Sequence, residues 1–483
     1  MKQEQKKSQE GLSVKKEENF SEWYTQLILK AELADYTSVS GCMVFKPTAW
    51  QIWEKIRDEV DKKLKKMGVK NVYFPMFIPE SLLKKEQEHL KGFAPEVAWV
   101  TQAGNTKLQE RLAVRPTSEA IMYESYAKWI RSWRDLPLKY NQWSNVVRWE
   151  FNNPIPFFRT REFIFNEGHT AFATKKEAEA EEEKIIGMYK EILEDHMAIP
   201  GIIGKKTDKE KFAGAEYTVT IENYLPNKKA IQGPDFHHDG QNFAKAYDIK
   251  FKDKNGKEDY VWQNTWAIST RMLGVMFALH SDNNGLVLPP KIAPNKIVII
   301  PIQSKKNEKV MKKAKEIERQ FSRYEPILDN RSEVTPGWKF NEWELKGIPL
   351  RIEIGPKDLE KNQATIISRD NLHKQEVKIK DLNKFVEEEL NNIQGRLFNK
   401  ANKFLQSGLD KAEDLKSAIA KIKEKKLVLV PLKNSEEVED ILKEKTNGAK
   451  TLNIPSDQPP IKGKKCIISG EQADYWVYIG KSY

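Results

Sequence analysis

Apolar residues recur every three or four positions in several stretches of the 483-residue chain, and this spacing predicts amphipathic helices. Two such helices follow one another near the N-terminus, at residues 20–36 and 47–67. The second opens with a proline, has Thr48 and Gln51 at the spacing of a capping box, and is followed by Gly68 as a stop. Its predicted buried stripe is Trp50, Trp53, Ile56, Val60, Leu64 and Met67.

Two later runs, residues 147–151 and 159–169, predict the strands of an antiparallel hairpin. The loop between them contains Pro154 and Pro156, and proline cannot continue a ladder. Strand side chains alternate between faces, so one face carries Arg148, Glu150, Arg159, Arg161, Phe163, Phe165, Glu167 and His169. A plain solvated face is one explanation. The mixture of aromatic rings with arginines favours a site for an anionic, planar ligand.

The rest of the pattern divides the chain into domains. A strand at residues 70–77 contains Pro75, which belongs at a sheet edge or an interface. A helix of small residues begins near Thr270, and a double proline at 289–290 marks a boundary. Beyond it, strands and helices alternate in a compact α/β module. The predicted domains are a disordered leader at 1–19, a first domain at 20–290, the α/β module at 291–400 and a small unit at 401–483.

Composition adds a cellular setting. The net charge of +11 and the pI of about 9.1 suggest a polyanionic partner without establishing one. The two cysteines, Cys42 and Cys466, fit a reducing compartment. No apolar run is long enough to span a membrane, and the N-terminus lacks the apolar core of a signal peptide. These features predict a soluble, cytoplasmic protein.

The arginines of the hairpin are candidates for binding a nucleotide. Neither GxxxxGK[ST] nor GxGxxG occurs in the chain, so a nucleotide would be held by side chains. Arg148, Arg159 and Arg271 are the best candidates for anion clamps, and Glu150 is a candidate acceptor for an exocyclic amine. Such a set stabilises the charge that develops in phosphoryl or nucleotidyl transfer.

No metal site is predicted. His237 and His238 are adjacent, so on regular structure they point apart and cannot chelate together. Cys466 stands in "CIIS", where a zinc knuckle would need a second thiolate at Ser469. Cys42 is interpreted as a small packed residue.

The hairpin resembles motif 2 of the class II aminoacyl-tRNA synthetases, with "VRWE" as its Arg-x-Glu strand. Residues 47–75 resemble motif 1, the dimer element, and "STRMLGVMFALHSDNNGLVLPP" resembles motif 3, with Arg271 as its arginine. Within the class, the chain is similar from about residue 20 to its end to the prolyl-tRNA synthetases of the archaeal and eukaryotic type. The similarity rests on the joint order and spacing of "FSEWYTQLILKAELADY", "RPTSE", "FFRTREF", "KFAGAEYT", "LVLPP", "PGWKFNEWELKG" and the terminal Tyr483.

The resemblance implies an α+β catalytic domain with an antiparallel sheet flanked by helices, an α/β anticodon-binding domain and a small α/β C-terminal domain. It implies a homodimeric ligase that forms prolyl-adenylate from L-proline and ATP, with Mg2+ beside the nucleotide. The prolyl group then passes to the 3′ end of tRNA(Pro). In-line attack of a carboxylate on the α-phosphorus needs positioning and charge neutralisation rather than a nucleophilic side chain.

The family's roles for proline carry over to matching positions. Thr117 and Glu119 are implied to accept the two N–H groups of the secondary ammonium, and Arg148 to hold the carboxylate and the α-phosphate. The rest of the implied proline pocket is Phe165, His169, Phe212, Trp266 and Ser269.

The implied ATP contacts come from the same motifs. Phe163 would stack under adenine, with Arg271 on its other side and Glu150 at the amino group. Arg159 would reach the outer phosphates, and Gln232 the ribose.

Two assignments lie outside the motifs. Glu344 and Arg351, in "ELKGIPLR", are implied to read the guanines of the anticodon. A surface ion pair on a strand is the alternative. Tyr483 is implied to reach back toward the active site, and a frayed terminus is the alternative.

Several positions depart from the family pattern. Asp235 and Phe236 stand where the family has threonine and serine, which leaves the nucleotide contacts of that segment open. Ala267 stands where glycine is expected and should slightly crowd the backbone beside the amino acid. Relatives often carry tryptophan in place of Phe165. Many also bind zinc through four cysteines in the last domain, and with Cys466 alone this site is predicted to be lost.

The segment between Glu150 and Arg271 is too short for the editing insertion that bacterial-type relatives carry between motifs 2 and 3. Alanine is smaller than proline by only a couple of methylenes, and one methylene discriminates by roughly 10–200-fold. We therefore expect measurable activation of alanine that the protein does not itself correct.

Two other functions remain as alternatives. One is a sister synthetase for threonine, glycine or serine, although threonine calls for zinc ligands and glycine does not need an aromatic wall at Phe165 and Phe212. The other is a non-catalytic paralogue that only binds tRNA. The presence of Arg148, Glu150 and Arg271 argues against it.

Overall fold

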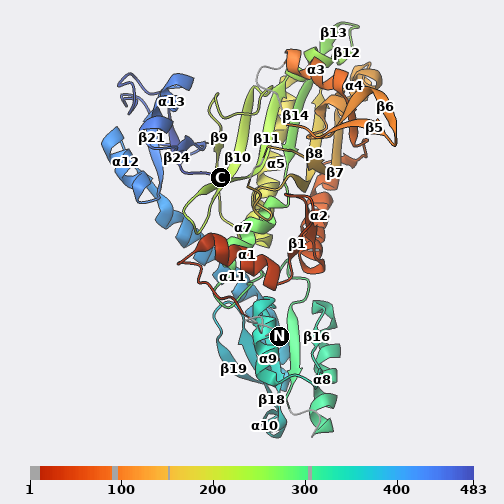
Figure 1. The fold of residues 1–483 in the computed structure, drawn as a ribbon, viewed down its shortest axis with the longest axis vertical. Helices are drawn as coiled ribbons and strands as arrows, with labels where there is room; N and C mark the ends of the chain where they lie inside the picture. Colours follow the sequence, from red (N-terminus) through yellow and green to blue (C-terminus); the bar gives the residue numbers. More distant parts are fainter. Residues whose placement is uncertain (1–10, 90–95, 151–152, 303–306) are drawn as a thin grey trace, which may run out of the picture.

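The computed structural model describes residues 11–89, 96–150, 153–302 and 307–483. Figure 1 shows three parts: an upper part built around a long sheet, a lower part coloured green to blue-green, and a C-terminal part in dark blue.

The largest sheet has eight strands, in the order β23 (Ile454–Pro455), β9 (Ile202–Lys205), β10 (Tyr217–Tyr224), β11 (Ala230–Gly240), β14 (Trp262–Ala267), β8 (Glu162–Phe172), β7 (Leu138–Val147) and β3 (Lys70–Asn71). All neighbours are antiparallel except β3 and β7. Helix α5 (Lys175–Glu191) packs on β8, β11 and β14. The expected α+β architecture, an antiparallel sheet flanked by helices, is therefore confirmed.

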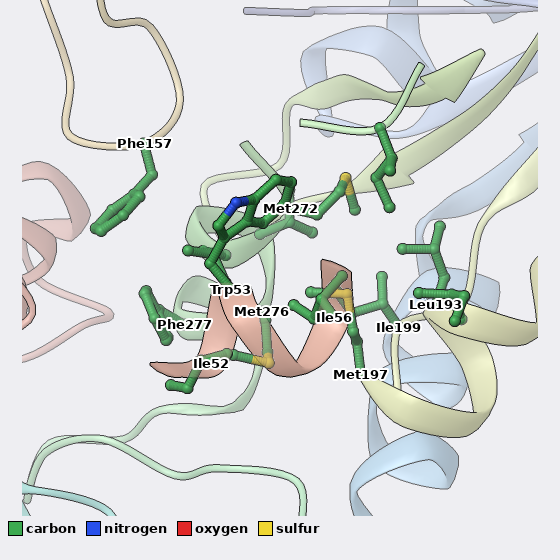
Figure 2. Close-up of a cluster of buried hydrophobic side chains, with 14 of the residues drawn as sticks. Ile52, Trp53, Ile56, Phe157, Leu193, Met197, Ile199, Met272, Met276 and Phe277 are labelled. Atoms are coloured by element: carbon green, nitrogen blue, oxygen red, sulfur yellow. The ribbon is translucent and has the colours of Figure 1, made fainter. Parts of the chain in front are cut away.

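Helix α2 (Pro47–Lys66) confirms the strongest helix prediction, and it packs against α7 (Arg271–His280). Full burial of a large apolar side chain contributes about 1.5–3 kcal/mol. The cluster that they share therefore holds α7, and with it Arg271, in place. Figure 2 shows members of this cluster: Ile52, Trp53, Ile56, Met272, Met276 and Phe277.

The start of α2 differs from the prediction. Its N-cap is Lys46, and no side chain caps the helix, so the capping box of Thr48 and Gln51 is wrong. Pro47 lacks an N–H and fits the first helical position, which places Thr48 inside the helix rather than at its cap. Trp50 lies outside the buried stripe and is 37% exposed.

The predicted hairpin forms, but its strands are displaced along the sequence. β7 and β8 pair antiparallel, with Val147 opposite Glu162, so residues 148–150 and 159–161 are not in the strands. Arg148 N still donates to Arg161 O, at 2.8 Å, but Arg161 N donates instead to Gly41 O, at 2.9 Å. A segment far away in sequence therefore ends the ladder. Phe151 lies outside the described residues.

The N-terminal segments also differ from the prediction. Helix α1 (Phe20–Lys30) ends early, and β1 (Ala34–Tyr36) pairs with β2 (Met43–Phe45). Part of the predicted disordered leader, residues 1–10, lies outside the described residues. The rest contacts the first domain, because Lys16 Nζ donates to Ser281 O at 2.8 Å. The prediction of disorder is therefore wrong for residues 11–19.

The strand predicted around Pro75 is split between two sheets. β3 lies at the edge of the large sheet and ends before Pro75. After the proline, β4 (Phe77–Pro79) joins β6 (Thr106–Val114) and β5 (Trp99–Ala103) in a three-stranded sheet. Pro75 itself lies between these two strands, so the prediction of one strand running through it is wrong.

The predicted α/β module has a five-stranded sheet in the order β16 (Ile327–Leu328), β15 (Ile297–Pro301), β17 (Leu350–Ile354), β18 (Gln363–Ser368) and β19 (Lys374–Lys378). The helices that contact it are α8 (Glu308–Gln320), α9 (Pro336–Leu345), α10 (Pro356–Glu360) and α11 (Leu382–Gly408). Helix α11 also contacts α7, so it links the module to the first domain.

The C-terminal unit has four strands, in the order β20 (Leu409–Lys411), β21 (Leu427–Leu432), β24 (Tyr475–Gly480) and β22 (Lys450–Thr451), with helices α12 (Leu415–Lys423) and α13 (Glu436–Lys445). Its strand β23 pairs with β9 and so extends the large sheet. Within the described part of the chain, no helix has both the length and the apolar character needed to cross a membrane.

Candidate active site

A cavity of about 350 Å³ lies against the large sheet, on the face opposite α5. Asn264 of β14 points to α5, because its Nδ2 donates to Ala178 O at 2.9 Å, whereas its neighbour Thr265 lines the cavity. The segment before α4 (Glu119–Trp129) and the start of α7 complete the walls. The predicted site residues that line the cavity are Thr117, Glu119, Arg148, Phe163, Phe165, His169, Phe212, Gln232, Trp266, Ser269 and Arg271.

Other lining residues had no role in the sequence analysis. The strongest case is Glu167, which lies between Phe165 and His169 on the same face of β8. The period-two pattern already placed it there. The same pattern aligns Asp235 and His237 on β11. The remaining unassigned lining residues are Gly168, Glu210, Thr218, Gly233, Thr265 and Ala267.

Two guanidinium groups, those of Arg148 and Arg271, line the cavity. Arg271, the first residue of α7, donates through Nε to Phe158 O at 3.3 Å and through Nη1 to Gln232 O at 3.2 Å. Burial lowers the pKa of Arg271, and the nearby Arg148 guanidinium lowers it further. Arg148 Nε donates to Pro116 O at 3.0 Å. Two guanidinium groups that repel each other across a cavity favour an anion between them.

Two buried carboxyl groups, those of Glu119 and Glu167, also line the cavity. Thr117 Oγ1 donates to Glu119 Oε2 and lies 3.2 Å from Glu167 Oε1. Gln142 Nε2 donates to Glu167 Oε2 at 3.4 Å. Burial raises the pKa of Glu167 to about 7, and the Glu119 carboxylate adds to the rise. A cation with N–H donors is the natural complement to these two carboxylates.

Aromatic rings form further parts of the cavity wall. The rings of Phe163 and Phe165 meet edge to face, with centroids 5.6 Å apart, and Phe212 packs against His237 at 4.6 Å. Burial lowers the pKa of His237, as it does for His169, so both imidazoles are neutral near pH 7. The walls therefore suit a small molecule that combines an apolar body with a cation and an anion.

Gly168 is required by the close approach of Trp266. A Cβ atom built on Gly168 would lie 2.1 Å from the Trp266 ring, far inside van der Waals contact. Trp266 is 1% exposed and lies opposite Gly168 in the ladder between β14 and β8. Any larger residue at position 168 would displace it.

The departures from the family pattern take different positions. Asp235 lines the cavity, and its Oδ2 accepts from Gln232 Nε2 at 2.9 Å. Phe236 is fully buried on the other face of β11, in the core. Ala267 lies opposite Asp235 in the ladder and also faces the cavity. Asp235 thus orients the side chain predicted to face ribose.

Two predicted nucleotide contacts do not line the cavity. Glu150 is exposed in the turn after β7, and Arg159 lies in the loop before β8, where it pairs with Ile155 in an isolated bridge. The charge of Arg159 nevertheless lowers the pKa of Arg271, behind burial and Arg148 in effect. The structure therefore places neither residue in the cavity wall, although the charge of Arg159 acts on Arg271.

The C-terminal tyrosine, Tyr483, packs against Phe158, a residue that contacts Arg271. The rings of Tyr483 and Phe158 stack with centroids 5.3 Å apart, and Tyr483 OH accepts from Asn227 Nδ2 at 2.7 Å. Tyr483 N donates to Ala230 O at 3.1 Å. The carbonyl oxygen of Phe158 accepts a hydrogen bond from Arg271. Phe158 therefore contacts both Tyr483 and this arginine. Tyr483 is ordered by these contacts and does not line the cavity.

The two predicted anticodon residues meet in the α/β module. Arg351 Nη1 donates to Glu344 Oε1 at 2.8 Å, and Arg351 Nε donates to Glu353 Oε1 at 2.9 Å. The Arg351 guanidinium also lies 4.4 Å from the Phe340 ring centroid. The ion pair given as the alternative is therefore present, and the role in tRNA binding stays a prediction.

Across residues 11–89, 96–150, 153–302 and 307–483, no group of three or more His, Cys, Asp or Glu side chains is arranged to hold a metal ion. Cys466 is buried, and its Sγ accepts from Ser469 N at 3.5 Å. The predicted loss of the zinc site stays a prediction.

Comparison with known proteins agrees with this geometry. A family model described as the tRNA synthetase class II core domain (G, H, P, S and T) matches residues 99–280. A model of an anticodon binding domain matches residues 296–389, and one of the prolyl-tRNA synthetase C-terminal domain matches residues 415–483.

Curated relatives match nearly the whole chain. It is 45% identical to the cytoplasmic proline–tRNA ligase of Arabidopsis thaliana over 486 residues, covering 98% of this chain and 91% of that protein. It is 47% identical to proline–tRNA ligase 2 of Bacillus cereus over 479 residues, covering 99% and 100%. A proline–tRNA ligase of Clostridium botulinum is 46% identical over 468 residues, covering 97% of each chain.

Proposed function

The chain belongs to the prolyl-tRNA synthetase family of class II aminoacyl-tRNA synthetases, and from this premise we propose how its cavity works. The activity is that of a proline–tRNA ligase, which activates L-proline with ATP and transfers it to tRNA. One observation carries the proposal: a single cavity is lined both by two guanidinium groups and by buried carboxylates. This arrangement complements the zwitterion of an amino acid.

Proline binds with its ring between the aromatic walls. The secondary ammonium donates to Thr117 and Glu119, and the ring contacts Phe165, His169 and Phe212, which line the same cavity. Because both imidazoles are neutral, they do not repel the ammonium. Trp266 and Ser269 complete the pocket.

ATP binds beside Arg148 and Arg271. Its adenine ring stacks on Phe163, and Arg271 lies on the other face of the adenine. Gln232 faces the ribose, in an orientation fixed by Asp235. A carboxylate oxygen of proline attacks the α-phosphorus, the bond to the β-phosphate oxygen breaks, and pyrophosphate leaves. Arg148 and Arg271 neutralise the charge that develops.

The contacts farther from the cavity are proposals on the resemblance. Glu150 is assigned to the adenine amino group and Arg159 to the outer phosphates, from positions outside the cavity wall. ATP is expected to arrive with Mg2+ on its phosphates. Glu344 and Arg351 are proposed to read the anticodon of tRNA(Pro). We also propose a cytoplasmic location, as the name of the Arabidopsis relative states for that protein.

Pyrophosphate exchange across the amino acids tests this function. Proline is expected to drive exchange of label between pyrophosphate and ATP, and alanine to do so with a kcat/KM about 10²–10³-fold lower. A reaction without amino acid is the control. Exchange driven best by threonine, glycine or serine would identify a sister synthetase. If none of the amino acids drives exchange, the result would support a non-catalytic tRNA-binding paralogue.

A homodimer through motif 1 is expected from exposed apolar side chains beside β3 and β4. Tyr73, Met76 and Phe77 are 74%, 37% and 43% exposed. Replacing Tyr73 with aspartate would place a charge in this surface, and burying an unpaired charge is costly. We expect the dimer dissociation constant to rise by about 10²-fold or more.

Light scattering after size exclusion measures this change against the chain mass of 56.1 kDa. Leu372→Asp is the matched control, since Leu372 is 40% exposed but belongs to the α/β module. It is expected to leave the dimer unchanged. A single-chain mass for the unaltered protein would contradict the homodimer.

A further inference from the structure

We propose that Glu167 positions Thr117 for proline binding. Glu167 accepts a hydrogen bond from the Thr117 hydroxyl group, so that the Thr117 oxygen can itself accept a hydrogen bond from an N–H of the secondary ammonium. The inference deepens the proposed function and rests on it. Thr117 and Glu119 bind the substrate, and Glu167 acts through Thr117.

The geometry places one hydroxyl between two buried carboxylates. Glu167 and Glu119 are 3% and 5% exposed, and both line the cavity. Thr117 Oγ1 contacts Glu119 Oε2 on one side and lies 3.2 Å from Glu167 Oε1 on the other. Gln142 fixes the second oxygen of Glu167 at 3.4 Å. The Glu167 carboxyl group therefore cannot turn away without losing that contact.

Counting donors shows why the second carboxylate is needed. A threonine hydroxyl has one proton and two lone pairs. In the free site, neutral Glu167 donates to the Thr117 oxygen, and the Thr117 proton goes to Glu119. A secondary ammonium brings two N–H donors, one for Glu119 and one for Thr117. The Thr117 hydroxyl must then turn its hydrogen bond away from Glu119, and Glu167 is the carboxylate within reach to accept that hydrogen bond.

This exchange is balanced in protons and charge. Glu167 must be ionised to accept, so proline binding releases one proton from Glu167 to solvent. Before binding, the pair holds one carboxylate and one neutral acid; afterwards it holds two carboxylates and one ammonium, with the same net charge. Burial raises the pKa of Glu167 to about 7, so the proton is present at pH 6 and largely absent at pH 8.

Other charged and titratable groups surround this pair. Burial lowers the pKa of both His169 and His237, which favours the neutral imidazoles. Asp239 is the competing group, since burial raises its pKa well above the usual range. Further charges come from the segment before α4, the first residue of α4, the residue after β7, and β11: Arg115, Glu119, Arg148 and Asp235.

Calorimetric titration of the full-length enzyme with proline tests the inference. Titrations in two buffers of different ionisation enthalpy count the protons released. We expect release of nearly one proton per site at pH 6 and almost none at pH 8. The dissociation constant of proline should rise by up to about tenfold per pH unit below pH 7.

Glu167→Gln removes the ionisable group while keeping the shape. We expect it to weaken proline binding by about 10–100-fold, to abolish proton release, and to leave the KM for ATP unchanged. Asp239→Asn is the matched control. Asp239 is also buried but does not line the cavity, so proton release should persist in that variant.

Three outcomes would overturn the inference. A proline dissociation constant that does not vary from pH 6 to 8 in the unaltered enzyme does so whether or not Glu167→Gln folds. Equal proton release in Glu167→Gln and in the unaltered enzyme would also overturn it. Loss of proton release in Asp239→Asn alone would assign the released proton to Asp239 instead. Absence of proline-dependent exchange in the unaltered enzyme would contradict the proposed function itself, and this inference with it.

Discussion

Replacing Arg271 with alanine is expected to lower kcat for proline-dependent pyrophosphate exchange by about 10³-fold, because one preorganised charge stabiliser contributes 10²–10³ or more. Arg271 combines a position in the cavity wall with a fixed orientation, held by Phe158 O and Gln232 O. Arg271→Lys should recover only part of the rate, since a lysine keeps the charge but loses the planar fork. Exchange assays at saturating proline and ATP measure both variants.

The control for this prediction lies on the same hairpin. Arg161 donates through Nη1 to Ser40 O at 3.1 Å, stacks 4.5 Å from the Trp149 ring centroid and does not line the cavity. Arg161→Ala is expected to stay within about threefold of the unaltered rate. Melting curves exclude a fold defect in Arg271→Ala. A properly folded Arg271→Ala with a rate close to normal would contradict the assigned role.

Sequence periodicity predicted the parts of the fold that local patterns determine. Helix α2 follows from an apolar stripe of period 3.6, and the face of β8 follows from alternation through Phe163, Phe165 and His169. The ends of these elements could not be predicted in the same way. The ladder stops at Glu162 because Gly41 O takes the N–H of Arg161, and no local pattern encodes this contact.

The residues of the candidate site also fall into those that local sequence indicates and those that depend on tertiary contacts. Motif resemblance identified Thr117, Arg148 and Arg271, because short motifs keep their residues at fixed positions. The role of Glu167 depends on burial by three separate segments, which bring Thr117 and Gln142 against it. A glutamate on an alternating strand is equally consistent with a solvated face until those segments are placed. Its raised pKa is therefore a property of the tertiary structure.

A buried ion pair joins the anticodon module to the catalytic domain, in addition to the contact of α11 with α7. Arg369, which follows β18, is 3% exposed and donates through Nη1 and Nη2 to the two carboxylate oxygens of Asp282, at 2.8 and 2.7 Å. Its Nε donates to Glu344 O at 2.8 Å. Asp282 follows α7, the helix that begins with Arg271. A proposed anticodon residue and a proposed catalytic residue are thus joined through this pair.

Asp282→Asn is expected to destabilise the enzyme by about 3 kcal/mol, because it leaves Arg369 charged and buried without its anion. The melting temperature of the first unfolding transition should fall by about 5–10 °C. Aminoacylation of tRNA should fall more than pyrophosphate exchange, since the altered contact lies between the domains rather than in the cavity. Calorimetry and the two assays measure these effects. Arg396→Ala is the control, because Arg396 pairs with Asp370 within the module, at 2.7 Å.

The pH dependence of this difference identifies its cause. Burial of Asp282 favours the neutral acid, but hydrogen bonds and the charge of Arg369 outweigh it and lower the pKa of Asp282. A carboxylate with a lowered folded-state pKa stabilises the fold above its unfolded value near 4, and this contribution is lost as the pH falls through the folded value. The stability gap between the unaltered enzyme and Asp282→Asn should therefore be full at pH 7 and close below about pH 4. A gap that persists at low pH would show that packing, rather than the ion pair, joins the domains.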